Sequence, residues 1–567
     1  MSAIVRTIIW NLFLKMTKLK YLIFLMLALP MLAVAQSASD TLPSQASSAD
    51  TTKVKRNYVH LLHADVTKYN KKINPDVWVL TGDVTFRHDS MYMYCDSAYF
   101  YNRKNALKAF GNVRMEQGDT LFLYGDYLDY DGDTNLARVR NNVRLEDKTS
   151  ILETDSLDYN RTLNLGYYFG GGTLYDDEST LDSEWGEYNT ITKEAVFRYD
   201  VDLQNPQFIM ASDTLHYNTG TNIAKIVGPT RVLSGQSKIY SELGYYDTRR
   251  RQATLLDRSV VTNGNRDITA DSLFNDELSG LSEAYGNIVL NDTVNKNLLA
   301  GEYGYFNTFK DSVYITGAAM AVDYSQGDSL YLHADTIWMV TLDAKSDSMY
   351  RQMRAYNKVR AYRKDIQAVC DSLIFDSRDS CMTMYSDPIL WHNGQQLVGE
   401  EIKMYMDSSF IDNVHVINQS LYAEKMGENE YNQINGKEMI FIFRDKKLSE
   451  MQVIGGVNVI YFPLDDDSLM IGMNTTIAGK LVGTMKDGKM HKLVIPTKSN
   501  GVFYPMSQIP PESRYLENFV WFDYIRPVDK DDIFHWRGKR KGQELKKIKR
   551  GSIPLPTLDR FKEKGKK

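Results

Sequence analysis

Residues 111–130 read GNVRMEQGDTLFLYGDYLDY, and two signatures in this stretch recur through most of the chain. The first is a glycine or asparagine followed by apolar residues at alternating positions, as in Gly111-Asn112-Val113-Arg114-Met115. The second is an acidic residue followed by alternating positions that end in a large apolar side chain, as in Asp126-Tyr127-Leu128-Asp129-Tyr130. Apolar side chains at every second position are typical of a β-strand with one buried face. Each signature therefore predicts one strand.

The acidic residue of the second signature recurs at a nearly constant interval. We call these residues the acidic anchors: Asp65, Asp96, Asp126, Asp155, Glu184, Asp213, Glu242, Asp271, Glu302, Asp335, Asp371, Glu400 and Glu438. Five consecutive intervals between anchors are 29 residues, and all but one of the later intervals are longer, as insertions in turns would make them. Turn residues such as Asp131-Gly132-Asp133-Thr134 separate the strands. The chain is predicted to contain about thirteen or fourteen copies of one antiparallel hairpin.

A hairpin with a single apolar face cannot bury that face alone, so the copies are expected to stack into a quasi-one-dimensional β array. A parallel β-helix and an antiparallel sheet folded over on itself into a trough both fit the period. Turn signals after every strand favour the antiparallel trough. The glycine before valine in the first signature predicts a bend or bulge in that strand. The fold class is therefore predicted to be all-β, with the repeats spanning residues 57–505.

The composition agrees with many half-buried strands and gives no global electrostatic partner. Tyrosine is abundant (37 residues), proline is scarce (14 residues) and the mean hydropathy is −0.39. The formal net charge of −5 is small for 567 residues. Basic residues gather only near the end, where residues 537–567 hold 13 Lys or Arg against three acidic residues. Residues 506–567 are therefore interpreted as a C-terminal extension with a basic tail, either solvated or in contact with anionic headgroups or an acidic partner.

The first 35 residues are interpreted as a secretory signal. Lys15, Lys18 and Lys20 precede the apolar run of residues 21–32, and Ala33-Val34-Ala35 offers a cleavage site. The alternative is a membrane anchor, but the run is shorter than the roughly 20 residues that a spanning helix needs. Translation can start at Met1 or at Met16. Residues 36–56 are polar without periodicity and are interpreted as a linker.

The sequence contains no catalytic constellation, so no enzymatic activity, metal site or cofactor is predicted. His63 and His333 both stand two residues before an acidic anchor, which repeat geometry explains. Cys95 and Cys370 occupy one repeat position, and the inferred register does not place Cys381 opposite Cys370, so no disulfide framework is predicted. The acidic anchors are expected to cap strand ends or accept turn hydrogen bonds. A ladder of carboxylates that binds cations is the alternative.

The phased pairing of Gly-Asn-Val-x-apolar with Asp-x-Leu-x-Tyr over most of residues 57–505 resembles the OstA-like, or organic solvent tolerance, family. That family includes the periplasmic bridge of lipopolysaccharide transport and the N-terminal domain of the outer-membrane translocon. The resemblance implies a β-jellyroll, or "β-taco", with an open apolar groove that shields acyl chains while sugars stay in water. The chain has more repeats than the short bridge proteins and lacks the translocon's long run of membrane-facing strands. It therefore resembles an elongated bridge.

The partners that the resemblance implies are lipopolysaccharide or a similar glycolipid, other jellyroll proteins or a second copy joined by end-to-end strand pairing, and the outer-membrane translocon. The implied location is the periplasm, where association with the outer membrane is also compatible with the resemblance, and nucleic acid is not an expected partner of an exported chain. We regard a periplasmic carrier as the leading hypothesis. A closed β-solenoid that acts as a spacer or adhesin is the second, and a β-helix polysaccharide lyase or hydrolase is the third.

The period-two pattern also identifies the residues expected to line the groove. Apolar side chains on the predicted buried face of each strand are the candidates for lipid binding, and simple core packing between two faces is the alternative for the same residues. The candidates are Val84, Phe86, Val113, Met115, Leu128, Tyr130, Val143, Leu145, Leu157, Tyr159, Leu215, Tyr217, Ile288 and Leu290.

Overall fold

The computed structural model of the protein describes residues 57–545, except for 73–74, 177, 326, 344–348, 408–409, 487–488, 497 and 518. The predicted signal (1–35), the predicted linker (36–56) and the last 22 residues of the basic tail lie outside this part of the chain. Within the described residues, no helix is long and apolar enough to cross a membrane.

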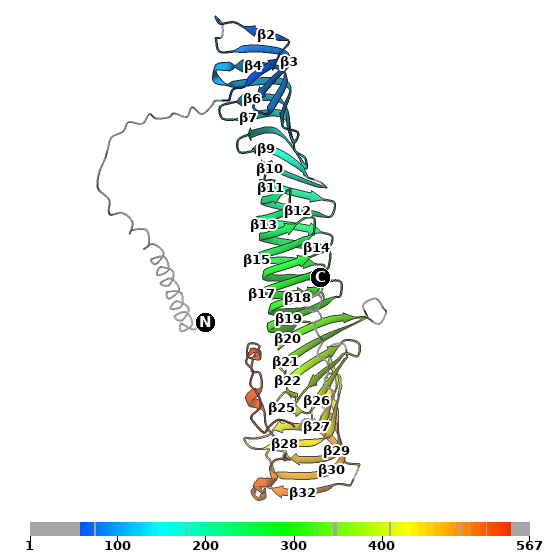
Figure 1. The fold of residues 1–567 in the computed structure, drawn as a ribbon. Helices are drawn as coiled ribbons and strands as arrows, with labels where there is room; N and C mark the ends of the chain where they lie inside the picture. The colour runs from blue at the N-terminus through cyan, green and yellow to red at the C-terminus, as the bar shows by residue number, and fades with distance from the viewer. Residues whose placement is uncertain are drawn as a thin grey trace, which may run out of the picture. The chain divides into compact units, whose positions relative to one another are not determined.

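The described residues form a long antiparallel sheet, so the prediction of an all-β fold built from hairpins is confirmed. Consecutive strands pair with each other and lie across the long axis of the stack (Figure 1). The first half comprises β1 (His60–His63), β2 (Val66–Tyr69), β3 (Trp78–His88), β4 (Met91–Tyr101), β5 (Ala106–Gln117), β6 (Leu121–Asp131), β7 (Leu136–Glu146), β8 (Ser150–Asn160), β9 (Leu165–Asp176), β10 (Ser179–Asn189), β11 (Glu194–Asn205), β12 (Phe208–Asn218), β13 (Ile223–Ser234), β14 (Ser237–Asp247), β15 (Gln252–Asn263) and β16 (Arg266–Asp276).

The second half continues the same order, but two of its strands are each divided into two shorter pieces, β23 with β24 and β25 with β26. It comprises β17 (Leu281–Asp292), β18 (Asn297–Asn307), β19 (Ser312–Asp323), β20 (Leu330–Leu342), β21 (Tyr350–Tyr362), β22 (Ile366–Asp376), β23 (Cys381–Tyr385), β24 (Ile389–His392), β25 (Gln395–Val398), β26 (Glu401–Asp407), β27 (Phe410–Lys425), β28 (Tyr431–Arg444), β29 (Lys447–Tyr461), β30 (Gly472–Lys486), β31 (Lys489–Val494) and β32 (Asn500–Pro505). The 3-10 helices are η1 (Asn102–Lys104), η2 (Met506–Gln508), η3 (Pro511–Ser513), η4 (Asp523–Ile525) and η5 (Asp532–Phe534).

A bulge bends each strand of the first signature near its middle, as the glycine predicts. Between β4 and β5 the register steps from Tyr94↔Arg114 to Ser97↔Phe110, so β5 has one residue more than β4 between these pairs. The extra length falls at Gly111 and Asn112, whose φ angles are 74° and 45°. A bulge increases the local bend and twist of a strand. The same step in successive strand pairs makes a continuous corner, and the two arms of the sheet fold toward each other across it.

The acidic anchors lie along this corner and accept hydrogen bonds from amide side chains of the bulges. Asn112 Nδ2 donates to Asp96 at 2.9 Å, Asn142 Nδ2 to Asp126 at 2.7 Å and Asn287 Nδ2 to Asp271 at 2.6 Å. These contacts agree with the predicted role as hydrogen-bond acceptors. No group of three or more His, Cys, Asp or Glu side chains arranged to hold a metal ion is present in the described residues.

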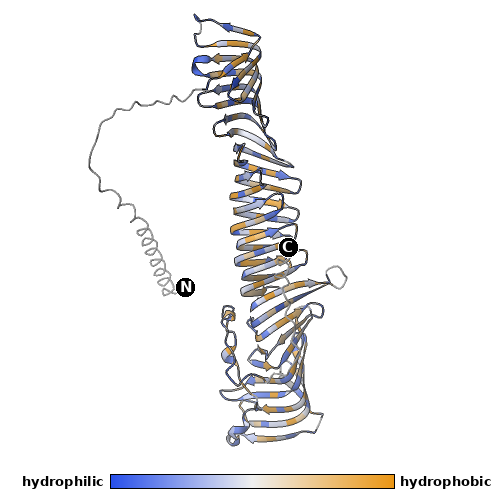
Figure 2. Ribbon diagram, viewed as in Figure 1, coloured by the Kyte–Doolittle hydropathy of each residue, from blue (hydrophilic) through white to orange (hydrophobic). Residues whose placement is uncertain are grey.

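The arms end in two rows of hairpin turns. The first row follows the strands of the first signature, such as β3, β5 and β7, and the second row follows the strands with acidic anchors, such as β4, β6 and β8. We call the line where the two rows meet the seam. Between the arms, buried apolar side chains form one hydrophobic core that reaches from Val59 to Leu481. Along each strand these side chains alternate with hydrophilic ones, which gives the striped pattern of Figure 2.

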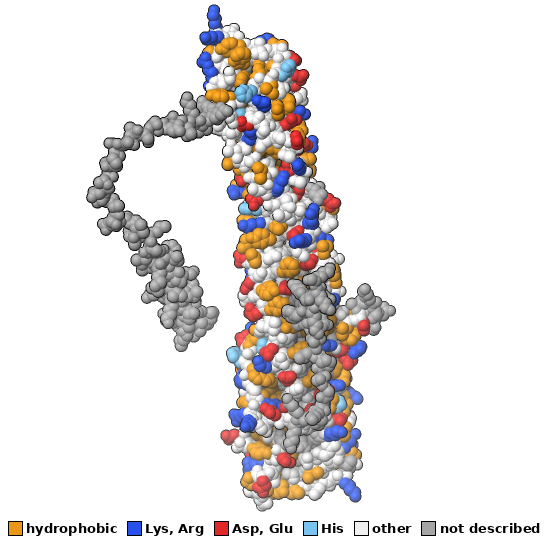
Figure 3. All heavy atoms as spheres, in the orientation of Figure 1, with side chains coloured by type: hydrophobic (Ala, Val, Ile, Leu, Met, Phe, Trp, Pro, Cys, Tyr) orange, Lys and Arg blue, Asp and Glu red, His pale blue; other side chains and the backbone are white. Residues whose placement is uncertain are grey.

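The outer surface carries charges of both signs, scattered along the stack on the face that Figure 3 shows. The three cysteines are buried and free. The strand register places Cys381 opposite Asp376 and Cys370 opposite Val359. His333, one of the two repeat-phased histidines, donates a 2.8 Å hydrogen bond from Nδ1 to the carbonyl oxygen of Ala319 and lies against the ring of Phe534.

Residues 506–545 leave the sheet after β32 and turn back along the outer face from β30 to β20, where they are coloured orange to red in Figure 1. We call this segment the C-terminal strap. It covers a second hydrophobic cluster, in which Phe522 and Ile525 of the strap contact Trp391 and Leu421 of the sheet. Two fully buried glutamines, Gln396 and Gln433, hydrogen-bond to the backbone of the strap. The side-chain amide of Gln396 donates to Val520 O and accepts from Phe522 N, both at 2.8 Å.

Candidate functional site: the interior of the jellyroll

The fourteen predicted groove residues all lie on the inner face of the sheet, in the continuous hydrophobic core. Each is at most 5% exposed, and the most exposed of them is Leu290. Period-two parity therefore places every one of these side chains between the two arms. In this part of the stack they lie in close contact, and the cavity beside Met115 and Tyr159 measures about 10 Å³. The aromatic rings add their own contacts, such as Phe86 against Phe100 with centroids 5.3 Å apart.

Side-chain contacts close the seam over the same repeats. Each joins a residue near a first-row turn to a residue 41 to 45 positions farther along, near a second-row turn. We call these contacts the seam latches: His88–Tyr130 (2.6 Å), Asp147–Tyr188 (2.6 Å), Asp176–Tyr217 (3.0 Å), Ser234–Glu277 (2.6 Å) and Arg266–Asp311 (2.5 Å). The open groove that the family resemblance implies is thus closed by side chains between His88 and Asp311.

Four of the five latches combine a carboxylate with a hydroxyl or cationic donor, and the fifth pairs His88 with the Tyr130 hydroxyl. Asp147 accepts hydrogen bonds from Tyr188 Oη and Lys193 Nζ, both at 2.6 Å. Burial alone would raise the pKa of Asp147, but the hydrogen bonds from Lys193 and Tyr188 outweigh it and lower that pKa. Burial raises the pKa of the Tyr130 hydroxyl to about 12, so this latch is a neutral phenol beside His88. Asp147 is therefore ionised and Tyr130 neutral near pH 7, as their hydrogen bonds require.

A larger cavity of about 310 Å³ opens in the interior farther along the chain, between Leu330 and Lys446. We call it the interior cavity. Its inner walls are apolar and include Leu332, Leu373, Met384, Leu390 and Met404. This volume is within the range of ligand pockets in proteins, which is roughly 300–1,000 Å³. The cavity is thus large enough for part of a flexible apolar ligand.

Charged side chains stand at the mouth of the interior cavity. Arg363 and Asp365, from the turn between β21 and β22, form an ion pair at 2.6 Å. Lys446, from the turn between β28 and β29, lies with its Nζ 3.7 Å from the centroid of the Phe410 ring. Burial lowers the pKa of His392, the nearby Asp365 carboxylate opposes this shift and Arg363 adds to it. His392 is therefore neutral near pH 7, and the mouth is cationic overall.

The residues of the interior cavity are not among the fourteen that period-two parity singled out. Two adjacent strands bring methionines at alternating positions to it, namely Met382 and Met384 in β23 and Met404 and Met406 in β26. Methionine is flexible and suits irregular apolar surfaces. This pairing of alternating methionines in neighbouring strands is the signal in the sequence from which the cavity could have been found.

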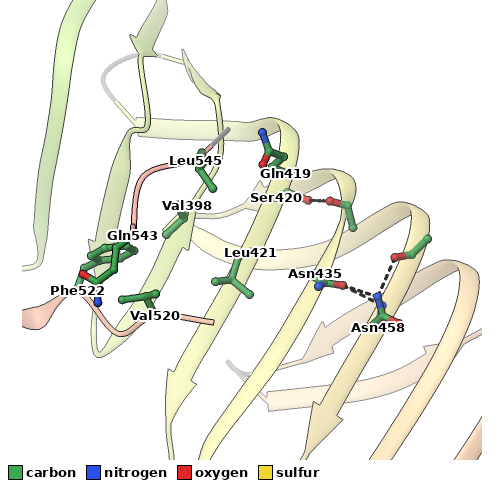
Figure 4. Close-up of a pocket in the computed structure, with 12 residues that line it drawn as sticks. Val398, Gln419, Ser420, Leu421, Asn435, Asn458, Val520, Phe522, Gln543 and Leu545 are labelled. Atoms are coloured by element: carbon green, nitrogen blue, oxygen red, sulfur yellow. Dashed lines mark hydrogen bonds between the residues drawn. The ribbon is translucent and has the colours of Figure 1, made fainter. Parts of the chain in front are cut away.

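A second pocket, of about 160 Å³, lies on the outer face where the strap passes the corner of the sheet (Figure 4). Val398, Leu421 and Phe522 provide apolar contacts, and the amides of Asn435 and Asn458 hydrogen-bond to each other at 2.9 Å. Its walls include strap residues Val520 and Leu545, so its shape depends on the strap. It does not communicate with the core residues described above, because the sheet lies between them.

Two comparisons relate parts of this chain to known proteins with OstA-like or LptA-like descriptions. LptH from Pseudomonas aeruginosa, described as the LptA homologous periplasmic component of the conserved lipopolysaccharide transport device, is a similar solved structure. It is 10% identical, and the alignment covers 18% of this chain and 76% of that chain with a TM-score of 0.17. No curated protein matches the chain. Residues 56–213 match the model of a family described as OstA-like protein. Over these residues the chain is therefore similar to the OstA-like family, and the same bulged hairpin continues beyond them along the sheet.

Proposed function

We propose that this protein is a non-enzymatic periplasmic carrier that binds lipopolysaccharide or a related glycolipid in the interior of its jellyroll and passes it toward the outer membrane. The observation that carries this proposal is the apolar interior, which runs without interruption from Val59 to Leu481 and widens into a cavity of about 310 Å³. Transfer of an acyl chain from water into such an interior is favourable by about 0.8 kcal/mol per CH₂ group. The match of residues 56–213 to the OstA-like family also supports this proposal.

Acyl chains would lie between the arms, against the inner faces that carry Val113, Leu157 and the other candidate groove residues. The arms are covalently continuous at the corner but meet at the seam through side chains alone, so the seam is where they can part. Sugars and phosphates would stay outside the seam in water. Each hairpin adds a similar apolar surface to the interior. A ligand can therefore move from one hairpin to the next without meeting a single site of much higher affinity.

The two ends of the sheet provide the surfaces for partners. At one end, β1 and β2 pair with β3 through one edge, and at the other end β31 and β32 pair with β30. An edge strand presents unpaired backbone groups to which another strand can add. We propose that a second copy, another jellyroll protein of the pathway or the outer-membrane translocon pairs with these edges.

The close contact of side chains between His88 and Asp311 favours a second candidate, a closed structural rod that serves as a spacer or adhesin. Such a rod needs no hollow in its core, whereas the interior cavity is expected of a carrier. A polysaccharide lyase or hydrolase would need converging acidic and basic groups, and here the acidic anchors are spread along the corner with amide partners.

Photocrosslinking in cells tests the carrier. A photoreactive amino acid is placed at the inward positions Val113, Leu157 and Met404, each at most 4% exposed, and at Arg114 on the outer face as the control. We expect adducts with lipopolysaccharide from the inward positions and none from Arg114. Absence of adducts from every inward position, in a folded and exported protein, would contradict the carrier and favour the structural rod.

A further inference from the structure

We propose that the interior cavity is a side port at which a single amphiphile with an acyl chain and an anionic headgroup enters the jellyroll. Its chain would lie against Met384 and Met404, and its headgroup would meet Lys446 and Arg363. This inference rests on the proposed function, because it assumes that the interior takes acyl chains. It goes further by assigning the place of access and the charge of the headgroup.

The position of the seam latches supports a port at this place. The five latches lie between His88 and Asp311, where they join the first and second rows of turns. The interior cavity lies beyond them, and its walls come from both rows, with Arg363 and His392 at first-row turns and Lys446 at a second-row turn. A chain that enters here does not have to break a buried carboxylate contact, which would cost about 1–3 kcal/mol for each group left unpaired.

The walls of the cavity suit a flexible hydrocarbon better than a rigid ligand. Met382, Met384, Met404 and Met406 come from two paired strands and face the same space. Their unbranched side chains can move aside and pack around a chain of variable shape. Leu390 adds a further apolar side chain to the lining. The floor of the cavity belongs to the same core as Val113 and Leu157, so an acyl chain bound here lies against an apolar surface that continues into the rest of the interior.

The charges at the mouth favour an anionic headgroup. Lys446 is exposed, its ammonium lies over Phe410, and within the described part of the chain it forms no ion pair with a carboxylate. Arg363 is paired with Asp365, and its guanidinium keeps donors beyond the two that bond this carboxylate. His392 is neutral near pH 7 for the reasons given above. A phosphate or carboxylate at the mouth therefore finds one unpaired cation and a second, partly available one.

Equilibrium binding of two matched lipids to the purified full chain tests the port. The probes are 1-myristoyl lysophosphatidic acid and 1-monomyristoylglycerol, which share one acyl chain and differ in the charge of the headgroup. Both are used below the concentration at which they form micelles. Lys446→Glu is expected to weaken binding of the anionic lipid about tenfold and to change binding of the neutral lipid by less than about twofold. Lys238→Glu, an exposed lysine beside a distant turn, is the matched control and should change neither.

Filling the cavity tests whether the acyl chain of the lipid binds there. Met404→Trp and, as a smaller change, Ala361→Leu place extra carbon atoms in the cavity and are expected to weaken both lipids at least about fivefold, since the space is about 310 Å³. Thermal unfolding shows which variant keeps the fold, and the one that does is used. Unchanged binding to Lys446→Glu and to the folded cavity variant, with normal binding to the wild type, would overturn the port and leave the carrier intact.

An equal loss of both lipids in Lys446→Glu would overturn the assignment of an anionic headgroup. The carrier itself fails by a separate route. If the wild type binds neither lipid and the inward positions Val113 and Leu157 give no crosslinks in cells, the proposed function is wrong, and the port with it.

Discussion

Asp147 shows how a single carboxylate links the two arms of the sheet. Its side chain is 5% exposed and accepts hydrogen bonds from Tyr188 and Lys193, which come from a different arm. These donors lower its pKa below the ordinary value of 3.8 although burial opposes the shift. A group with a lowered pKa in the folded state stabilises the fold above its unfolded pKa, and this contribution disappears as the pH falls through the folded pKa.

We therefore predict that Asp147→Asn lowers the free energy of unfolding by about 1–3 kcal/mol at pH 7. The difference from the wild type should shrink as the pH falls from 3.8 toward the lower pKa of the folded state, because the carboxyl of the unfolded wild type binds a proton before that of the folded protein does. Urea unfolding at pH 7 and at a pH below 3.8 measures this difference in the free energy of unfolding. Asp119→Asn, in an exposed turn, is the control and should have no effect at pH 7. A difference that stays constant with pH would contradict a charge-based latch.

Gly111 at the corner and Gly118 in the next hairpin turn allow backbone strain to be separated from steric conflict. Both have positive φ, at 74° and 60°, so an L side chain is strained at either position. A Cβ at Gly118 would meet open space, whereas a Cβ at Gly111 would lie 2.5 Å from Asp96 Oδ2. We predict that Gly118→Ala costs about 1 kcal/mol and that Gly111→Ala costs about 2–3 kcal/mol. Equal losses in denaturant unfolding would show that the corner can relax around Asp96.

At the level of elements, the strap depends on glutamines that reach out from the sheet. Gln396 is fully buried and bonds to both Val520 and Phe522 of the strap, and Gln433 bonds in the same way to Arg514 and Leu516 at 2.9 Å. Each glutamine thus satisfies one donor and one acceptor of the strap backbone, as a neighbouring strand would. Arg360, also fully buried, adds an ion pair with Asp532 at 3.4 Å.

We predict that Gln396→Leu loosens the strap, because it leaves two backbone groups without a partner at a cost of about 1–3 kcal/mol each. Limited proteolysis should then cut within residues 506–545 faster than in the wild type, while the strands of the first half stay protected. The control is Gln395→Leu, at the adjacent position. The Gln395 side chain donates a hydrogen bond to Glu424 of the sheet rather than to the strap. Equal protection of the strap in Gln396→Leu and in the wild type would show that the hydrophobic contacts of Phe522 and Ile525 hold it alone.

For the whole molecule, the open ends of the sheet predict assembly. Leu62 in β1 and Val66 in β2 are exposed apolar residues of the first edge, at 50% and 45%. Lysine on an edge strand is a known means of preventing strand addition. We expect the wild type to form end-to-end particles whose length rises with concentration in small-angle scattering, and the double variant Leu62→Lys, Val66→Lys to remain a monomer.

The matched control for this variant is Leu163→Lys with Ile191→Lys, two residues that are more exposed but lie in hairpin turns away from both edges. It adds the same charge and should assemble like the wild type. If both double variants lose assembly, charge repulsion rather than strand pairing controls it. If neither does, the edges of β1 and β2 are not the contact.

The local rules of a strand allowed much of the molecule to be predicted from its sequence. Alternation at period two places Val113, Leu128 and Leu157 on the inner face, and a strand has no other way to bury them. Gly111 before Val113 predicts the bulge, because positive φ there is accessible at low cost to glycine. The 29-residue interval predicts the stack of hairpins.

What the tertiary structure alone decided is how the two arms meet. The seam latches join residues 41 to 45 positions apart, such as Asp147 and Tyr188, and no local pattern shows whether such side chains reach each other. The same is true of the strap, where Gln396 binds residues 124 and 126 positions away. The sequence by itself determined which side chains face inward, since that depends on the backbone of one strand. Whether the interior is closed or hollow at a given repeat depends on contacts between distant strands, and only the folded molecule brings those strands together.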